Sequence, residues 1–168
     1  MTDVATLANA LTAAFERVHH ERMAGLPILH PRLSVAVIGA RQWRQDWLGM
    51  LLTPWCMNLV IVPGSASTFV AGPVGSKQLI EFPAGTFEFI ASDEADIGAF
   101  AACSMFSPMQ TFADQAAAVA TAEAIMVALF EPEPGGAQGG SRGDVAATSS
   151  GAGISRRDLL RGRVSRRC

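Results

Sequence analysis

The chain has 168 residues, of which 49% are hydrophobic and 17% are charged, and its formal net charge is −2. This length and composition predict one globular domain with a buried core. Residues 154–168 hold six Arg and one Asp (+5), whereas residues 1–153 hold seven basic and fourteen acidic side chains (−7). An acidic body with one short basic segment is a poor footprint for nucleic acid, which is therefore not a predicted partner.

Compartment and membrane association follow from three further features. No run of 18 or more apolar residues occurs, so stable membrane insertion is not predicted. The stretch from Met1 to Phe15 has no basic region and carries Asp3, which argues against a secretory signal. The three cysteines form no Cys-x-x-Cys motif and no disulfide framework. A reducing cytoplasm is the predicted location.

The first predicted element is an amphipathic helix. Apolar residues recur there with the i, i+3, i+4, i+7 spacing of one helix face: Val4, Leu7, Ala8, Leu11, Phe15 and Val18. Gly25 and Pro27 are expected to end the helix.

Strand-like runs follow the helix. Residues 33–37 alternate between apolar and small side chains, as in a strand with one buried face. Residues 47–52 and 57–62 are nearly continuous apolar runs, typical of buried strands. Thr53-Pro54-Trp55-Cys56 separates them, and we expect a bend there because proline lacks a ladder donor.

A hairpin is predicted next. Residues 77–82 and 87–91 flank Pro83-Ala84-Gly85-Thr86, whose proline and glycine favour a tight reversal. The acidic residues within 93–96 are interpreted as a solvated loop, and residues 99–106 as another buried strand.

A second amphipathic helix is predicted from the apolar residues between Phe112 and Leu129. Its N-cap is expected to be Ser107, with Pro108 as the first helical residue, or Thr111 with Asp114 three residues on. The predicted fold class is α+β: a mostly antiparallel sheet flanked by an N-terminal and a C-terminal helix, within a domain spanning residues 1–131.

Residues 132–153 are rich in Pro, Gly, Ser and Ala and are predicted to form a disordered linker. About 21 such residues would have a root-mean-square span of roughly 25 Å. The arginine-rich tail, residues 154–168, contains Ser155-Arg156-Arg157-Asp158-Leu159-Leu160-Arg161, whose order resembles a twin-arginine export signal placed at the wrong end of a chain.

This tail has three interpretations. It is a solubilising basic segment, it mimics a signal and occupies the chain's own binding groove, or it docks on an acidic surface of the partner or of the export machinery.

The sequence offers little for catalysis. The nucleophile motif Gly-x-Ser-x-Gly and the phosphate-binding glycine motifs are absent. His19 and His20 are consecutive on the first helix, so their side chains point about 100° apart and do not readily share a metal ion. Glu16 and His20 are one turn apart, but such a pair is usually a surface hydrogen bond. We therefore predict a non-catalytic protein without a cofactor or a metal site.

Several segments, taken in order and spacing, resemble the HybE/HupJ family of nickel–iron hydrogenase assembly chaperones. They are Leu29-His30-Pro31, Trp47-Leu48-Gly49, Leu52-Thr53-Pro54-Trp55, Val60-Ile61-Val62-Pro63-Gly64, residues 82–89, residues 103–109 and Arg156–Gly162. The resemblance implies a cytoplasmic factor that attends an exported hydrogenase before translocation. Its implied partners are the precursor small subunit with its twin-arginine signal, the large subunit, or both.

A chaperone needs exposed apolar or aromatic anchors. The predicted partner-binding residues are Pro54, Trp55, Met57, Phe82, Pro83, Gly85, Thr86, Pro108, Met109, Arg156 and Arg157. For the aromatic residues and methionines the alternative role is core packing, and for the prolines and glycine it is turn geometry. The alternative function is a metal- or redox-handling accessory protein that uses His20, Cys56 or Cys103.

Overall fold

The structure is a computed structural model that describes residues 3–132. Its elements are α1 (Val4–Val18), the π-helical turn η1 (His19–Met23), β1 (Ala36–Trp43), β2 (Asp46–Leu52), β3 (Met57–Val62), β4 (Lys77–Phe82), β5 (Gly85–Glu94), β6 (Gly98–Phe106) and α2 (Gln115–Ala128). The predicted linker and arginine-rich tail lie outside the described residues. Within residues 3–132, no helix is both long and apolar enough to cross a membrane.

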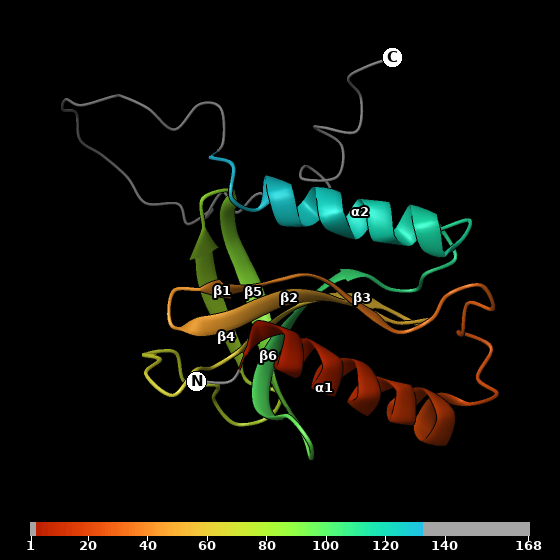
Figure 1. Cartoon of the computed structure of the whole chain (residues 1–168), viewed down its shortest axis with the longest axis horizontal. Coiled ribbons are helices and arrows are strands. Elements are labelled where there is room, and N and C mark those ends of the chain that lie inside the picture. The colour runs from red at the N-terminus through yellow and green to blue at the C-terminus, as the bar shows by residue number, and fades with distance from the viewer. Residues whose placement is uncertain (1–2, 133–168) are drawn as a thin grey trace, which may run out of the picture.

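All six strands form one antiparallel sheet in the order β1-β2-β3-β6-β5-β4. The first three strands are a meander, and the last three are a second meander. The two meanders are joined by the pairing of β3 with β6 (Figure 1). The predicted α+β fold with a mostly antiparallel sheet and two flanking helices is therefore confirmed.

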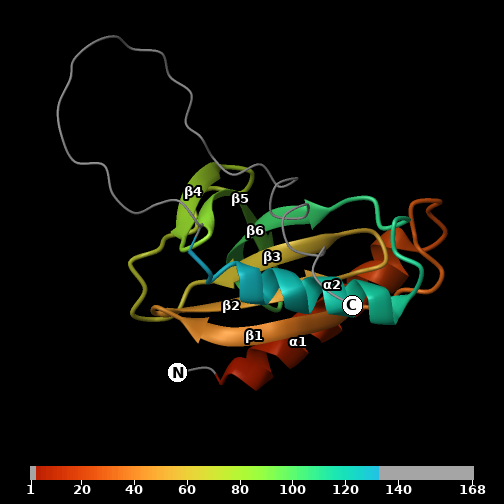
Figure 2. The same cartoon turned by 90° about the horizontal axis from the view of Figure 1, so that it is seen from above.

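The two helices cover opposite faces of the sheet, with α1 below and α2 above (Figures 1 and 2). Because alternate residues of a strand point to opposite faces, β2 sends side chains into both layers. Trp47 and Leu51 belong to the apolar cluster beside α1, whereas Leu48 and Met50 belong to the larger cluster beneath α2. Burial on both faces explains why β2 and β3 are apolar throughout.

The sheet curls until its two edges meet at one point. Trp43, the last residue of β1, stacks on Phe82 of β4 with 4.3 Å between ring centroids. The next residue, Arg44, donates from Nη2 to the Glu81 carbonyl oxygen at 3.4 Å. The hairpin of β4 and β5 also contacts the end of α2, because the Ala84 N–H donates to the Leu129 carbonyl oxygen at 3.1 Å. Figure 1 shows this hairpin rising toward α2.

Three predictions about local structure were wrong. The strand expected over residues 33–37 begins only at Ala36. Leu33 and Val35 are nevertheless buried, in the clusters beside α2 and α1 respectively, so their alternation reflects burial without a strand ladder. Two of the three acidic residues expected in a solvated loop, Asp93 and Glu94, belong to β5.

The N-cap of α2 is Asp114, whose Oδ1 accepts from the Ala117 N–H at 2.9 Å, and not Ser107 or Thr111. The chain before it is not helical because the Phe112 N–H closes a turn on the Met109 carbonyl oxygen at 3.1 Å. The side chains of Met109 and Phe112 are both buried in the core. These two anchors hold residues 107–113 in a loop and delay the start of the helix.

Candidate partner-binding site

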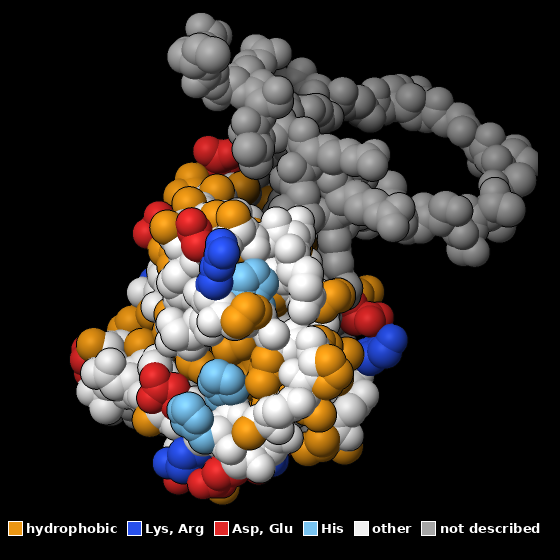
Figure 3. Space-filling model, turned by 90° about the vertical axis from the view of Figure 1, so that its right-hand side faces the viewer, with side chains coloured by type: hydrophobic (Ala, Val, Ile, Leu, Met, Phe, Trp, Pro, Cys, Tyr) orange, Lys and Arg blue, Asp and Glu red, His pale blue; other side chains and the backbone are white. Residues whose placement is uncertain are grey.

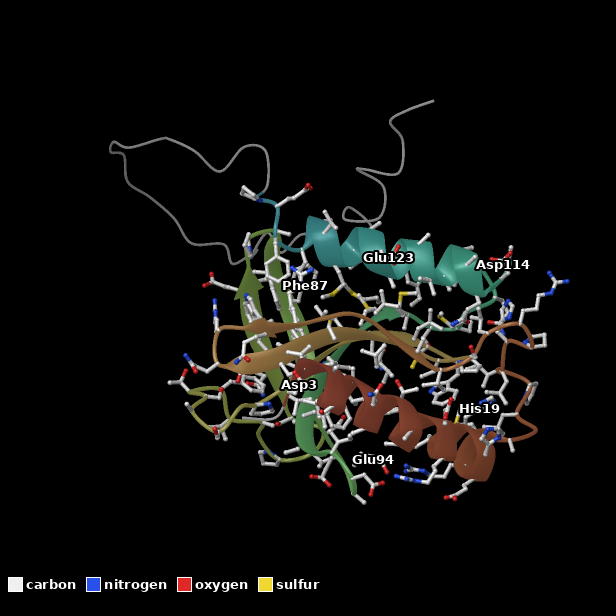
Figure 4. The ribbon with its side chains drawn as sticks, viewed as in Figure 1. Asp3, His19, Phe87, Glu94, Asp114 and Glu123 are labelled. Carbon is white, nitrogen blue, oxygen red and sulfur yellow. The ribbon has the colours of Figure 1, made fainter. Side chains whose placement is uncertain are left out.

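Four segments that are distant in sequence meet at one end of the molecule. They are η1, the loop of residues 24–35, the turn of residues 53–56 and the loop of residues 107–114, and together we call them the histidine end. Figure 3 faces this end, and histidine side chains lie there among hydrophobic ones. Figure 4 places His19 and Asp114 on this side of the molecule.

His30 joins three of these segments. Its backbone N–H donates to the Pro54 carbonyl oxygen at 2.9 Å. Its ring Nδ1 lies 3.1 Å from the Arg32 backbone nitrogen, and its Nε2 lies 2.8 Å from the Phe112 carbonyl oxygen. Because a backbone N–H can only donate, Nδ1 accepts and Nε2 carries the proton that is donated to Phe112. The buried imidazole is therefore a structural bridge between loops.

The turn of residues 53–56 is built around the buried hydroxyl of Thr53. Its Oγ1 donates to the Cys56 carbonyl oxygen at 2.9 Å and accepts from the backbone N–H groups of Cys56 and Trp55 at 3.0 and 3.3 Å. This arrangement turns Trp55 outward, where its ring lies 5.8 Å from that of His19. Burial raises the pKa of the Cys56 thiol, while hydrogen bonds to Thr53 and Asn58 oppose the shift.

The exposed part of the histidine end combines apolar and aromatic side chains with charged ones, among them Arg22, Arg32 and Asp114. Leu26 is 44% exposed and Ile28 is 38% exposed. The half-buried Trp55 and the stacked rings of His19 and His20, 5.0 Å apart, add flat surface. Gln110 holds the loop beneath them, because its Nε2 donates to the Ile28 carbonyl oxygen at 3.0 Å. Exposed apolar and aromatic side chains on a preformed scaffold are the usual anchors of a protein-binding surface.

Only some of the predicted binding residues lie on this surface. Trp55 is half-buried and Pro108 is exposed, and both belong to the histidine end. Pro54 is buried in the same turn, and Met57 and Met109 are fully buried in the core. These two methionines pack in the core, which is the alternative role given for them above.

The predicted hairpin residues lie at the opposite end of the molecule. Figure 4 shows Phe87 of the same hairpin far from His19. Phe82 is buried between Trp43, Phe87, Phe89 and Phe130, so it is a core residue. Pro83 is exposed, and Gly85 and Thr86 are half-buried. Arg156 and Arg157 lie outside the described residues.

Leu26 and Ile28 were not predicted as surface residues. Gly25 and Pro27 indicate the end of a helix and give no direct sign that their apolar neighbours are exposed. An available signal was the Leu-Pro-Ile-Leu run within a loop, where apolar side chains have no strand or helix face to bury them. The contact of His19 with Trp55 has no local signal, because the two residues are 36 positions apart.

The residues considered for metal or redox chemistry, His20, Cys56 and Cys103, lie in three different environments. His20 is exposed and stacks on His19, Cys56 lies in the turn of residues 53–56, and Cys103 is buried in the core on β6. Among residues 3–132, no group of three or more His, Cys, Asp or Glu side chains is arranged to hold a metal ion.

Comparison with known proteins identifies the family. The profile of the [NiFe]-hydrogenase assembly chaperone HybE matches residues 6–162. The chain is 36% identical over 165 residues to the hydrogenase expression/formation protein HupJ of Bradyrhizobium diazoefficiens, covering 98% of this chain and 93% of that one. It is 39% identical over 127 residues to HoxT of Azotobacter vinelandii, covering 73% and 80% of the two chains.

Two further relatives set limits on the comparison. The probable rubredoxin HupJ of Rhodobacter capsulatus is 35% identical over 125 residues, but the chain covers only 45% of its length. The solution structure of HybE from Escherichia coli matches with a TM-score of 0.59 at 23% identity, covering 86% of this chain and 91% of that one. At this identity the match establishes a shared fold.

These findings define a class of protein: the assembly chaperones of [NiFe] hydrogenases. The chain belongs to the HybE family of [NiFe]-hydrogenase assembly chaperones. The matched range includes Arg156 and Arg157, so the twin-arginine-like segment falls within the part of the chain that the family profile covers.

Proposed function

We propose that this protein binds a precursor subunit of a [NiFe] hydrogenase in the cytoplasm and holds it before export. The client is the small subunit with its twin-arginine signal, the large subunit, or both. The proposal rests on family membership together with one observation, the exposed apolar and aromatic surface of the histidine end. A surface that exposes Leu26 and Ile28 beside Trp55 suits a protein client.

The client is identified by purifying tagged full-length protein from hydrogenase-expressing cells and analysing the bound proteins by mass spectrometry. We expect a small subunit with its signal uncleaved, or an immature large subunit, in stable association. Recovery of neither subunit would contradict the proposal.

The binding surface is tested with a Leu26→Ser, Ile28→Ser variant and a Trp55→Ala variant. Removing a central anchor of an interface typically costs about 2 kcal/mol or more, so client recovery is expected to fall about tenfold or more. Val127→Ser is the matched control, because Val127 is an exposed apolar residue on α2. Equal recovery by all variants would move the client site away from the histidine end.

A further inference from the structure

A second apolar surface lies on the outer face of the hairpin of β4 and β5. Ile80 and Phe82 of β4 point into the core beneath α2, so Leu79 points to the opposite face. Leu79 is 71% exposed. Ile90 of β5, 43% exposed, lies diagonally across the ladder, because Leu79 pairs with Glu88 and Lys77 pairs with Ile90. α1 packs on β1 and β2, and the loop residues Ser67, Thr68 and Phe69 lie beside Leu79 and Glu81.

Carboxylates flank these two apolar residues on the same face of the ladder. Glu88 forms an ion pair with Lys77, whose Nζ lies 3.1 Å from Oε1. Glu81 is exposed, and among residues 3–132 its carboxylate has no ion-pair partner. We call Leu79, Glu81, Glu88 and Ile90 the hairpin patch. It combines exposed aliphatic side chains with two carboxylates, which lie near Lys77 and near the Arg44 guanidinium at the Glu81 carbonyl oxygen.

The described part of the chain ends beside this hairpin. The Leu129 carbonyl oxygen accepts from Ala84 at the hairpin turn, and the Phe130 ring packs edge-on against Phe82 with 6.2 Å between centroids. Figure 1 shows the end of the described chain at the tip of β4. Leu79 lies three residues from Phe82, which is about 10 Å along a strand. The linker predicted from the sequence, with a span of roughly 25 Å, is long enough to return to the patch.

The geometry points to an occupant: we propose that the chain's own segment 155–161 docks on the hairpin patch. Leu159 and Leu160 cover the apolar residues of the patch. The preceding Arg156 and Arg157 lie toward its carboxylates. The segment belongs to a tail of charge +5, whereas residues 1–153, the linker included, carry −7. The chaperone thus covers one of its own apolar surfaces with a segment that resembles an export signal, whichever hydrogenase subunit is its client.

The test is a nitroxide spin label on Cys168 of the full-length, ¹⁵N-labelled protein. Cys103 is buried and the Cys56 thiol has a raised pKa, so labelling at pH 7 favours Cys168, and mass spectrometry verifies the modified residue. We expect the amide signals of β4 and β5 to be broadened selectively. A Leu79→Ser, Ile90→Ser variant is expected to lose at least half of that broadening. Val127→Ser, a change of the same kind on α2, is expected to retain it.

An Arg156→Glu, Arg157→Glu variant leaves the described domain untouched and is expected to lose the broadening as well. Uniform broadening, or selective broadening that survives these changes, would overturn the proposal. Broadening in a mixture of spin-labelled unenriched chains and unlabelled ¹⁵N chains would assign the contact to a second copy. Perturbation of the patch only after a twin-arginine signal peptide is added would assign it to a client segment. Both of these results also overturn the proposal.

Discussion

Two buried polar side chains of the histidine end, His30 and Thr53, have structural roles: they hold loops together through hydrogen bonds. His30 and Thr53 use their side-chain hydrogen bonds on backbone groups of their own chain. Satisfied buried polar groups fix the geometry of loops that have no regular secondary structure. The exposed residues of this end therefore stand on a framework that the buried ones hold in place.

His30→Ala is expected to lower the free energy of unfolding by about 1–3 kcal/mol, because it leaves the buried Phe112 carbonyl and the partly buried Arg32 N–H without their hydrogen-bond partner. The measurement is urea-induced unfolding of the full chain. His20→Ala changes an exposed histidine of the same end and should alter stability by no more than about 0.5 kcal/mol. Similar losses in the two variants would show that the bridge contributes nothing.

The Cys56 thiol should be alkylated slowly at neutral pH. The thiolate is the reactive form, and a pKa raised by burial reduces its population below that of a free cysteine. In the folded protein, the alkylation rate of Cys56 should therefore rise at a higher pH than in the same protein unfolded in urea. Mass-spectrometric quantification of the Cys56 peptide across a pH series gives both curves. Coincident curves would contradict the raised pKa.

Within the elements, the edge strand β1 carries an irregularity that positions α2. The pairing of β1 with β2 shifts register between Ile38 and Arg41, and Gly39 within this bulge has a positive φ of 66°. A side chain at this position would meet Met126 of α2, with a Cβ only 2.9 Å from Cγ. Glycine thus serves both the left-handed backbone and the close approach of the helix.

A comparison of Gly39→Ala with Gly25→Ala separates the strain of the left-handed backbone from the close contact with α2. Both residues have positive φ, so both variants bear the left-handed strain of about 1–2 kcal/mol. Gly25 has no neighbouring atom within 4 Å of an added Cβ, whereas Gly39 must also displace Met126. We expect Gly39→Ala to be the less stable variant by at least about 1 kcal/mol in urea unfolding, as for overpacked cores. Equal free energies of unfolding for the two variants would mean that Met126 and α2 shift to accept the added Cβ without loss of stability.

For the molecule as a whole, local patterns predicted the elements better than the surfaces. The apolar runs of β2 and β3 and the turn before β5 identified an antiparallel sheet with helices, because burial on both faces leaves a direct record in the sequence. The strand predicted over residues 33–37 is β1, which spans Ala36–Trp43. Its second half exposes Arg41 and Gln42 at the sheet edge and therefore lacks an apolar signal. The exposure of single side chains was harder to predict, because the exposure of Leu26 or the burial of Met57 depends on contacts between distant segments.

The topology has a consequence for synthesis of the chain. β3 is apolar along most of its length and pairs on one side with β6, which ends at Phe106, about 44 residues after Val62. At about 5–20 residues per second, a ribosome needs roughly 2 to 9 s to make the intervening chain. During that interval the first meander has a bare apolar edge strand at β3, of the kind that recruits other chains. A member of an assembly-chaperone family thus itself passes through a stage at which its central strand is unprotected.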